Sequence, residues 1–137
     1  MDEAPVEFTN DEWKTMEKVL KVLQPFRDAT DMLSYHDASV SMVIPFVTTI
    51  LASLTHEDRR EEHGVLTLKR RLKTAMETRF GNIENIEEYT VATLLDSKYK
   101  GSFFRSPDTL DAAKNVLTER LVESLRKEGS SHDQVNY

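Results

Sequence analysis

The stretch VSMVIPFVTTILASL, residues 40–54, decides the fold of this sequence. Its apolar residues recur at three- and four-residue steps, which is the spacing of one face of an α-helix. This face contains Val40, Val43, Ile44, Val47, Ile50, Leu51 and Leu54. The β-branched content would also suit strands, but the length and the spacing favour a helix from about residue 39 to residue 54. Because the face is so broad, we expect this segment to be the most buried, with Pro45 bending it or opening its regular part.

A second helical pattern precedes this stretch. Thr9 and Glu12 have the spacing of a capping box, with Asn10 as an alternative cap. Behind them runs a stripe at helical spacing, formed by Trp13, Met16, Leu20, Leu23, Phe26, Thr30 and Leu33. Pro25 lies inside this pattern and removes a backbone donor, so the helix should kink there. Trp13 is the single tryptophan, and its place in the stripe predicts a position in the core.

Three more helices are predicted after a charged segment, residues 55–64, which we expect to be an exposed loop. Their approximate ranges are 65–80, 85–95 and 107–128. Gly81 stands where a left-handed cap would end the first of them, and Gly129 should end the last. The apolar stripe of the last helix contains Leu110, Ala113, Leu117, Leu121 and Leu125.

The chain of 137 residues has the length of one domain. Five apolar stripes that each avoid water predict an all-α fold, a single-domain helical bundle of about five helices. We expect a flexible N-terminus at residues 1–8, the bundle at residues 9–128 and a flexible tail at residues 129–137. The most apolar stretch is far shorter than the ~20 residues that cross a bilayer, so we predict a soluble protein without membrane contact.

Composition and motifs exclude several function classes. The absence of cysteine excludes disulfide scaffolds, Cys-based zinc modules and thiol catalysis. The glycines are too scattered for a phosphate-binding loop, and the motifs of α/β-hydrolases and zinc proteases do not occur. His56 and His63 stand seven residues apart in a charged loop, which is a poor match to zinc-ligand spacing. Asp96 follows an apolar run and is expected to bind backbone donors. We therefore predict no catalytic residue, no metal and no cofactor.

Positive charge gathers in the middle of an acidic chain. The net charge is −6, yet residues 69–105 hold 8 basic and 5 acidic residues. The candidate nucleic-acid-binding residues are Lys69, Arg70, Lys73, Lys98, Lys100 and Arg105. Basic residues beside Tyr99, Phe103 and Phe104 are typical of loops that stack on unpaired bases. In the other interpretation these aromatics anchor the loop while the cations stay solvated, and the acidic total favours that interpretation.

Two stretches resemble the helical insertion of hAT-superfamily transposases and of the BED-type zinc-finger proteins derived from them. The first consists of residues 13–34, which include the Pro25-Phe26 pair, followed by residues 40–45, which end in the Ile44-Pro45 pair. The second, ATLLDSKYK at residues 92–100, is similar to the family motif LDPRfK. Ser97 and Lys98 replace the usual proline and arginine, which should loosen the turn and remove a rigid donor fork. The motif residues with an expected structural role are Trp13, Pro25, Phe26, Pro45, Leu95, Asp96 and Lys100.

The resemblance implies a noncatalytic helical module from a nuclear transposase or a domesticated, transposase-derived regulator of transcription. Parent proteins of this kind bind DNA through a BED zinc finger and carry their catalytic acids in a separate nuclease core, so no catalytic residue transfers to this chain. The expected partners are DNA, through the parent protein, and a second copy of the protein. The alternative is a helical protein–protein interaction or dimerisation module that does not touch nucleic acid.

Overall fold

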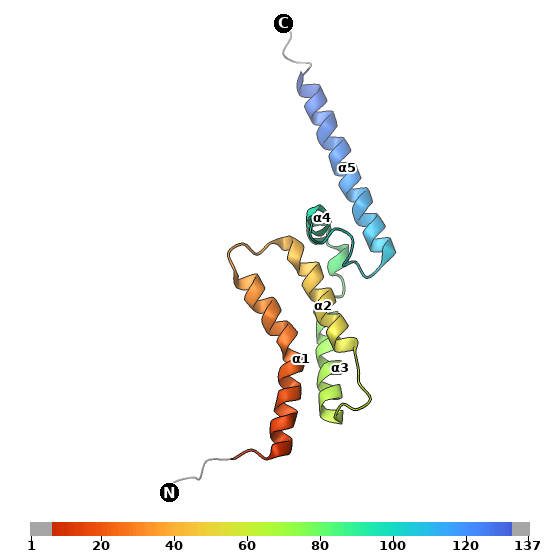
Figure 1. Ribbon diagram of the computed structural model, residues 1–137. Helices are drawn as coiled ribbons and strands as arrows, with labels where there is room; N and C mark the ends of the chain where they lie inside the picture. The colour runs from red at the N-terminus through yellow and green to blue at the C-terminus, as the bar shows by residue number, and fades with distance from the viewer. Residues whose placement is uncertain (1–6, 133–137) are drawn as a thin grey trace.

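The computed structural model describes residues 7–132, and five α-helices contain most of them (Figure 1). The helices are α1 (Asn10–Ser34), α2 (Val43–Thr55), α3 (His63–Phe80), α4 (Glu87–Leu95) and α5 (Pro107–His132). Short 3-10 turns, η1 and η2, occupy Val40–Met42 and Ile83–Asn85. No strand occurs in this part of the chain, so the predicted all-α class is confirmed. Within residues 7–132 no helix is long and apolar enough to span a membrane.

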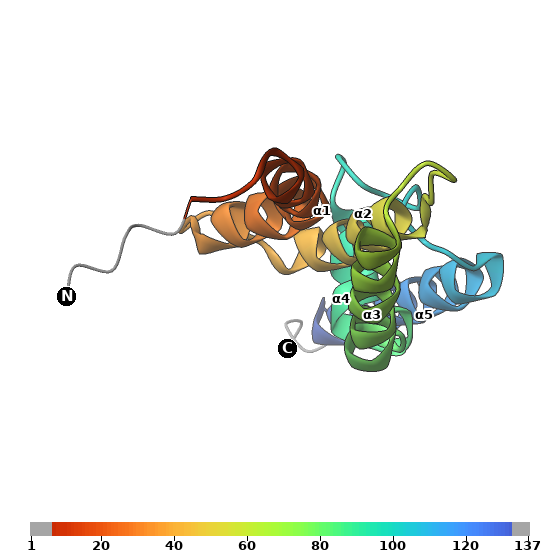
Figure 2. The same ribbon diagram turned by 90° about the horizontal axis from the view of Figure 1, so that it is seen from below.

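Helix α2 forms the centre of the core, as its broad apolar face predicts. It packs against both α1 and α3, and the three helices lie side by side in the ribbon views (Figures 1 and 2). Ile44 is fully buried, and Leu54 and Val47 are nearly so. The regular helix begins at Val43 and not near residue 39 as expected, because the 3-10 turn η1 occupies the residues before it. Pro45 lies in the first turn of α2, where backbone N–H groups have no partner within the helix, so it is accommodated there.

Helix α1 begins with the predicted capping box and buries a different face from the predicted one. The backbone N–H of Thr9 donates to Glu12 at 2.7 Å, and that of Glu12 donates to the Thr9 hydroxyl at 3.3 Å. The helix continues through Pro25, near which Figure 1 shows a change of direction. Its buried residues are Val22 and Ala29, with Phe26 packed beside them.

The predicted core position of Trp13 is wrong. Trp13 is 55% exposed and Leu20 is 65% exposed, and both lie about half a turn around α1 from the buried Val22. The helix carries two apolar stripes, and only one of them can face α2 and α3. The stripe through Val22 and Ala29 occupies that position, so the N-terminal part of the predicted stripe faces outward.

The last helix extends further than predicted and leaves the body of the fold. Ala113 is buried and α5 packs against α4 near its start, but Leu121 and Leu125 are exposed (Figure 1). The predicted end at Gly129 is wrong, because α5 continues to His132; one glycine costs a helix only about 1 kcal/mol. The two flexible ends that we predicted lie mostly outside the described residues, which exclude 1–6 and 133–137.

Gly81 does not form the predicted left-handed cap. Its φ and ψ angles are −60° and −27°, and its N–H donates to the Glu77 carbonyl at 2.8 Å, as in a continuing helix. The left-handed conformation occurs instead at Lys100, with a φ of 49°. The loop between α4 and α5 therefore makes its sharp turn at a lysine, where an L-residue is strained.

Candidate functional site

The structure does not bring the six basic candidates together on one surface. Lys69 departs most from the expected exposed position. Only 7% of Lys69 is exposed. Its Nζ donates to Glu61 Oε1 at 2.5 Å and to the His56 carbonyl at 2.9 Å. The side chain therefore fixes the loop between α2 and α3 against the core. This buried, paired position differs from the exposed one that we expected of a DNA contact.

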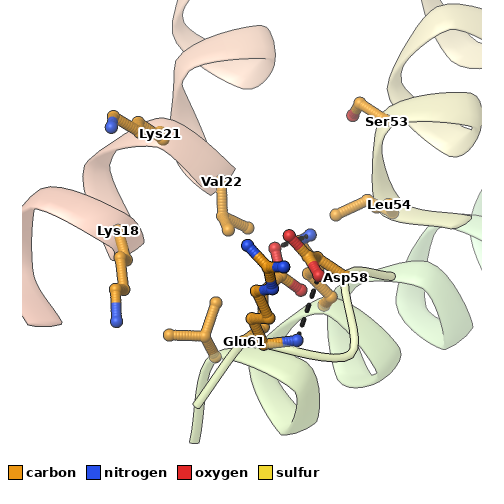
Figure 3. A pocket seen from close by; sticks show the side chains of 10 residues that line it. Lys18, Lys21, Val22, Ser53, Leu54, Asp58 and Glu61 are labelled. Atoms are coloured by element: carbon orange, nitrogen blue, oxygen red, sulfur yellow. Dashed lines mark hydrogen bonds and ion pairs between the residues drawn. The ribbon is translucent and has the colours of Figure 1, made fainter. Parts of the chain in front are cut away.

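A cavity of about 290 Å³ lies beside this ion pair, between α1, the end of α2 and the loop (Figure 3). Lys18, Lys21 and Val22 enter it from α1, opposite Ser53 and Leu54 of α2. Its lining is completed by Asp58, Arg60, Glu61, Val65 and Lys69. The Nζ of Lys18 forms an ion pair with Glu62 Oε1 at 2.6 Å. Several charged side chains of the chain therefore line this cavity, and some of them pair with one another.

The other candidates on α3 are also paired with carboxylates. Arg70 donates from Nε and Nη2 to the two carboxylate oxygens of Glu57, at 2.9 and 3.0 Å. The hydrogen bond from Arg70 lowers the pKa of Glu57. Lys73 lies 4.0 Å from Glu77, one turn further along the helix. Each of these cations has part of its charge compensated within the chain.

Arg105 is held by Glu84, a buried carboxylate in η2. Its backbone N–H and its Nε donate to Glu84 Oε1 at 3.0 and 3.1 Å, while Thr109 donates to Oε2 at 2.7 Å. Burial raises the pKa of Glu84, but the hydrogen bonds from Arg105 and Thr109 outweigh burial and hold the pKa below its usual value. This network attaches the start of α5 to η2, so Arg105 has a structural position.

Lys98 and Lys100 differ from the other four. Within residues 7–132 neither makes an ion pair. The Lys98 ammonium lies 5.2 Å from the centre of the Tyr99 ring, and that ring is buried edge-on against Phe103. Tyr99 is buried and Phe103 is packed against the core, so these rings anchor the loop, as in the second interpretation above. The two lysines remain exposed at the tip of the loop.

Asp96 ties the end of α4 to η1. The Ser41 hydroxyl donates to Asp96 Oδ2 at 2.6 Å, and the Lys98 backbone N–H donates to Oδ1 at 2.9 Å. These two bonds, that from Ser41 first, lower the pKa of Asp96. The contacts fit the structural role that we expect of this motif residue. Within the described ranges no group of three His, Cys, Asp or Glu side chains could hold a metal ion.

The surface that sequence reasoning missed is apolar. On α1 it consists of Trp13, Met16, Leu20 and Leu23, which we call the outer seam. Phe8 packs edge-on against the tryptophan, with the ring centres 5.6 Å apart. On α5 a smaller group is exposed, formed by Leu121, Val122 and Leu125. The missed signal was the second stripe of α1, formed by Val19, Val22, Phe26 and Ala29.

Comparison with known proteins gives two relatives. The chain is 33% identical to human "Zinc finger BED domain-containing protein 4" over 124 residues, which is 89% of this chain and 10% of that protein. It is 28% identical to human "Zinc finger BED domain-containing protein 6" over 131 residues, 88% of this chain and 13% of that protein. The chain therefore spans about a tenth of the length of these relatives. No family model matches the chain, and no solved structure matches it.

Proposed function

Because this chain is related to a region of BED-type zinc-finger proteins, as its motifs indicated, we propose that it is a noncatalytic helical module of a nuclear, transcription-regulating protein of that type. Its task is assembly: it holds other parts of the protein, or other subunits, beside the DNA-binding unit. DNA contact then belongs to the zinc finger of the parent protein. The relatives' names support only a DNA-binding-related family, and the specific role rests on the surface of this chain.

The contrast between the charged and the apolar surface carries this proposal. Four of the six candidate cations are next to a carboxylate of the chain itself, at Lys69, Arg70, Lys73 and Arg105. A cation with a carboxylate partner must give up that partner to bind a phosphate. Large apolar side chains on α1 and α5 are exposed instead, and contiguous apolar patches mark surfaces that other protein segments cover.

The state of the acidic residues supports a noncatalytic role. Asp96 and Glu84 are each held by hydrogen bonds within the chain, and the pKa of each lies below its usual value. A general acid or base works best with a pKa near the working pH. The pKa of each of these two carboxyls is therefore displaced away from the value that general acid–base catalysis at neutral pH favours.

A second candidate role is a local phosphate contact through Lys98 and Lys100. One observation favours it: these two lysines are exposed and make no ion pair within residues 7–132. Two phosphate contacts would change the salt slope of DNA binding by about two. Reversing both charges, with Lys98→Glu and Lys100→Glu, should remove that part of the slope if the role exists.

A deletion experiment tests the assembly role. The segment is removed from a protein that carries it together with a BED zinc finger, and light scattering and DNA titration are compared before and after. We expect the mass of the assembly to fall while the affinity for DNA stays within about twofold. A loss of DNA affinity of about tenfold or more at unchanged mass would show that the module binds DNA and not protein.

A further inference from the structure

The outer seam of α1 has the spacing of a coiled-coil interface. Trp13, Met16, Leu20 and Leu23 follow one another at steps of three, four and three residues, which is the repeat of heptad positions a and d. The buried stripe of α1 already satisfies the contacts with α2 and α3. The fold therefore uses one side of α1 internally and leaves a second helix-pairing side outside.

The size of this surface is that of a binding site. Trp13, Leu20 and Leu23 are 55%, 65% and 39% exposed, and the adjoining Phe8 is 47% exposed. Taking about 200 Å² for each large side chain, they leave on the order of 400 Å² of apolar surface in water. A patch of this extent along two heptads matches the face that one partner helix covers.

Acidic residues border the outer seam and disfavour a second copy as its occupant. Glu12 and Glu17 take the g and e positions beside the seam. In a parallel pair of α1 helices Glu12 would face Glu17 of the other copy. In the antiparallel register that pairs all four seam residues, the two Glu17 side chains would face each other. Both arrangements place like charges together, which opposes pairing.

We propose that the outer seam binds one amphipathic helix from a partner segment, whose apolar seam is bordered by lysine or arginine residues. Leucine-type side chains of that helix would pack between Trp13 and Leu23, and its cations would pair with Glu12 and Glu17. Glu17 makes no ion pair within residues 7–132, and Glu12 bonds only the capping Thr9. The inference rests on the proposed assembly role and names the chemistry of the partner.

Two synthetic peptides provide the test. Both are about three heptads long, with leucine at a and d and no tryptophan, and they differ only in lysine or glutamate at e and g. Trp13 is the single tryptophan, so its emission reports binding to the 137-residue chain. We expect the lysine peptide to bind saturably, and its affinity to fall several-fold between about 0.1 and about 0.5 M salt. The glutamate peptide should bind at least about tenfold more weakly.

Matched variants locate the binding. Leu20→Glu should weaken binding of the lysine peptide at least about tenfold. Leu125 on α5 is equally exposed, and Leu125→Glu should leave the affinity for this peptide within about twofold. Circular dichroism shows whether both variants keep their helices. Equal binding of the two peptides, or no binding of either, would overturn the partner chemistry. A dimer of the chain alone that Leu20→Glu abolishes would overturn it as well, since a second copy would then occupy the seam.

The outcomes separate this inference from the proposed function. If the peptides fail but deletion of the segment lowers the mass of the parent assembly, the assembly role stands and the outer seam is not its surface. If deletion leaves the mass unchanged, the assembly role itself fails, whatever the peptides do.

Discussion

Lys69→Met tests the assignment of Lys69 as an internal anchor. The substitution keeps much of the apolar stem but removes the ammonium from Glu61, whose side chain is only 23% exposed, and from the His56 carbonyl. Breaking a buried ion pair from one side costs about 3–5 kcal/mol. Because Glu61 retains some contact with water, we expect the free energy of unfolding to fall by about 3 kcal/mol. Urea unfolding followed by circular dichroism measures it.

The neighbouring Arg70 supplies the matched control. Its ion pair with Glu57 is exposed, at 63% and 39%, so Arg70→Met should cost less than about 1 kcal/mol. The double variant Lys69→Met with Glu61→Leu removes both charges and should recover most of the lost stability. A Lys69→Met protein as stable as Arg70→Met would contradict the internal-anchor assignment, since it would place the Lys69 ammonium in water, as the DNA-contact hypothesis requires.

Two further predictions concern Glu84 of η2, which binds Arg105 before the start of α5, and Lys100 in the loop between α4 and α5. The lowered pKa of Glu84 stabilises the fold above the ordinary glutamate pKa of about 4.3, and this stabilisation disappears as the pH falls toward the folded-state value. Urea unfolding at pH 7 and at about pH 3.5 should therefore show a smaller difference between the native chain and Glu84→Gln at the lower pH; a constant difference would contradict the pKa direction. Lys100→Gly should raise the free energy of unfolding by about 0.5–1 kcal/mol, because glycine adopts a φ of 49° without strain. The control Lys98→Gly should lower the free energy of unfolding. Thermal melts in which the two variants have the opposite order of stability would exclude strain at Lys100.

Local sequence signals predicted most of the secondary structure. The capping box at Thr9 and the broad apolar face of residues 40–54 each specify a helix through nearby residues alone. The number of helices and the central place of α2 follow from the same patterns. These features depend on contacts within one or two turns, which a sequence displays directly.

The choice of buried face on α1 depends on the partner helices and could not be predicted from one stripe. Both the stripe through Trp13 and the stripe through Val22 have helical spacing. We expected the first stripe to face the core, but the second, with Val22 and Ala29, is buried against α2 and α3. Which face of α1 is buried depends on where α2 and α3 lie, and the spacing along α1 does not contain that information.

The candidate basic residues show the same limit. Lys69, Arg70 and Lys73 are neighbours along the chain, yet only the first turns toward the core, because the loop brings Glu61 to meet it. The carboxylate partners of Lys69 and Arg70 stand eight and thirteen residues away, across a loop whose path the sequence does not specify. Charge could be counted from the sequence, but its pairing required the fold.

The exposure of Trp13 tests most directly the claim that the chain keeps a helix-pairing surface outside its core. Acrylamide, a neutral quencher that the carboxylates beside the seam do not repel, is titrated into the dilute chain, whose monomeric state is established by light scattering. We expect quenching about half as strong as that of a free tryptophan analogue, in line with a Trp13 residue that is 55% exposed. Emission from the monomer that resists acrylamide would place Trp13 in the core, and α1 would then have no exposed helix-pairing surface.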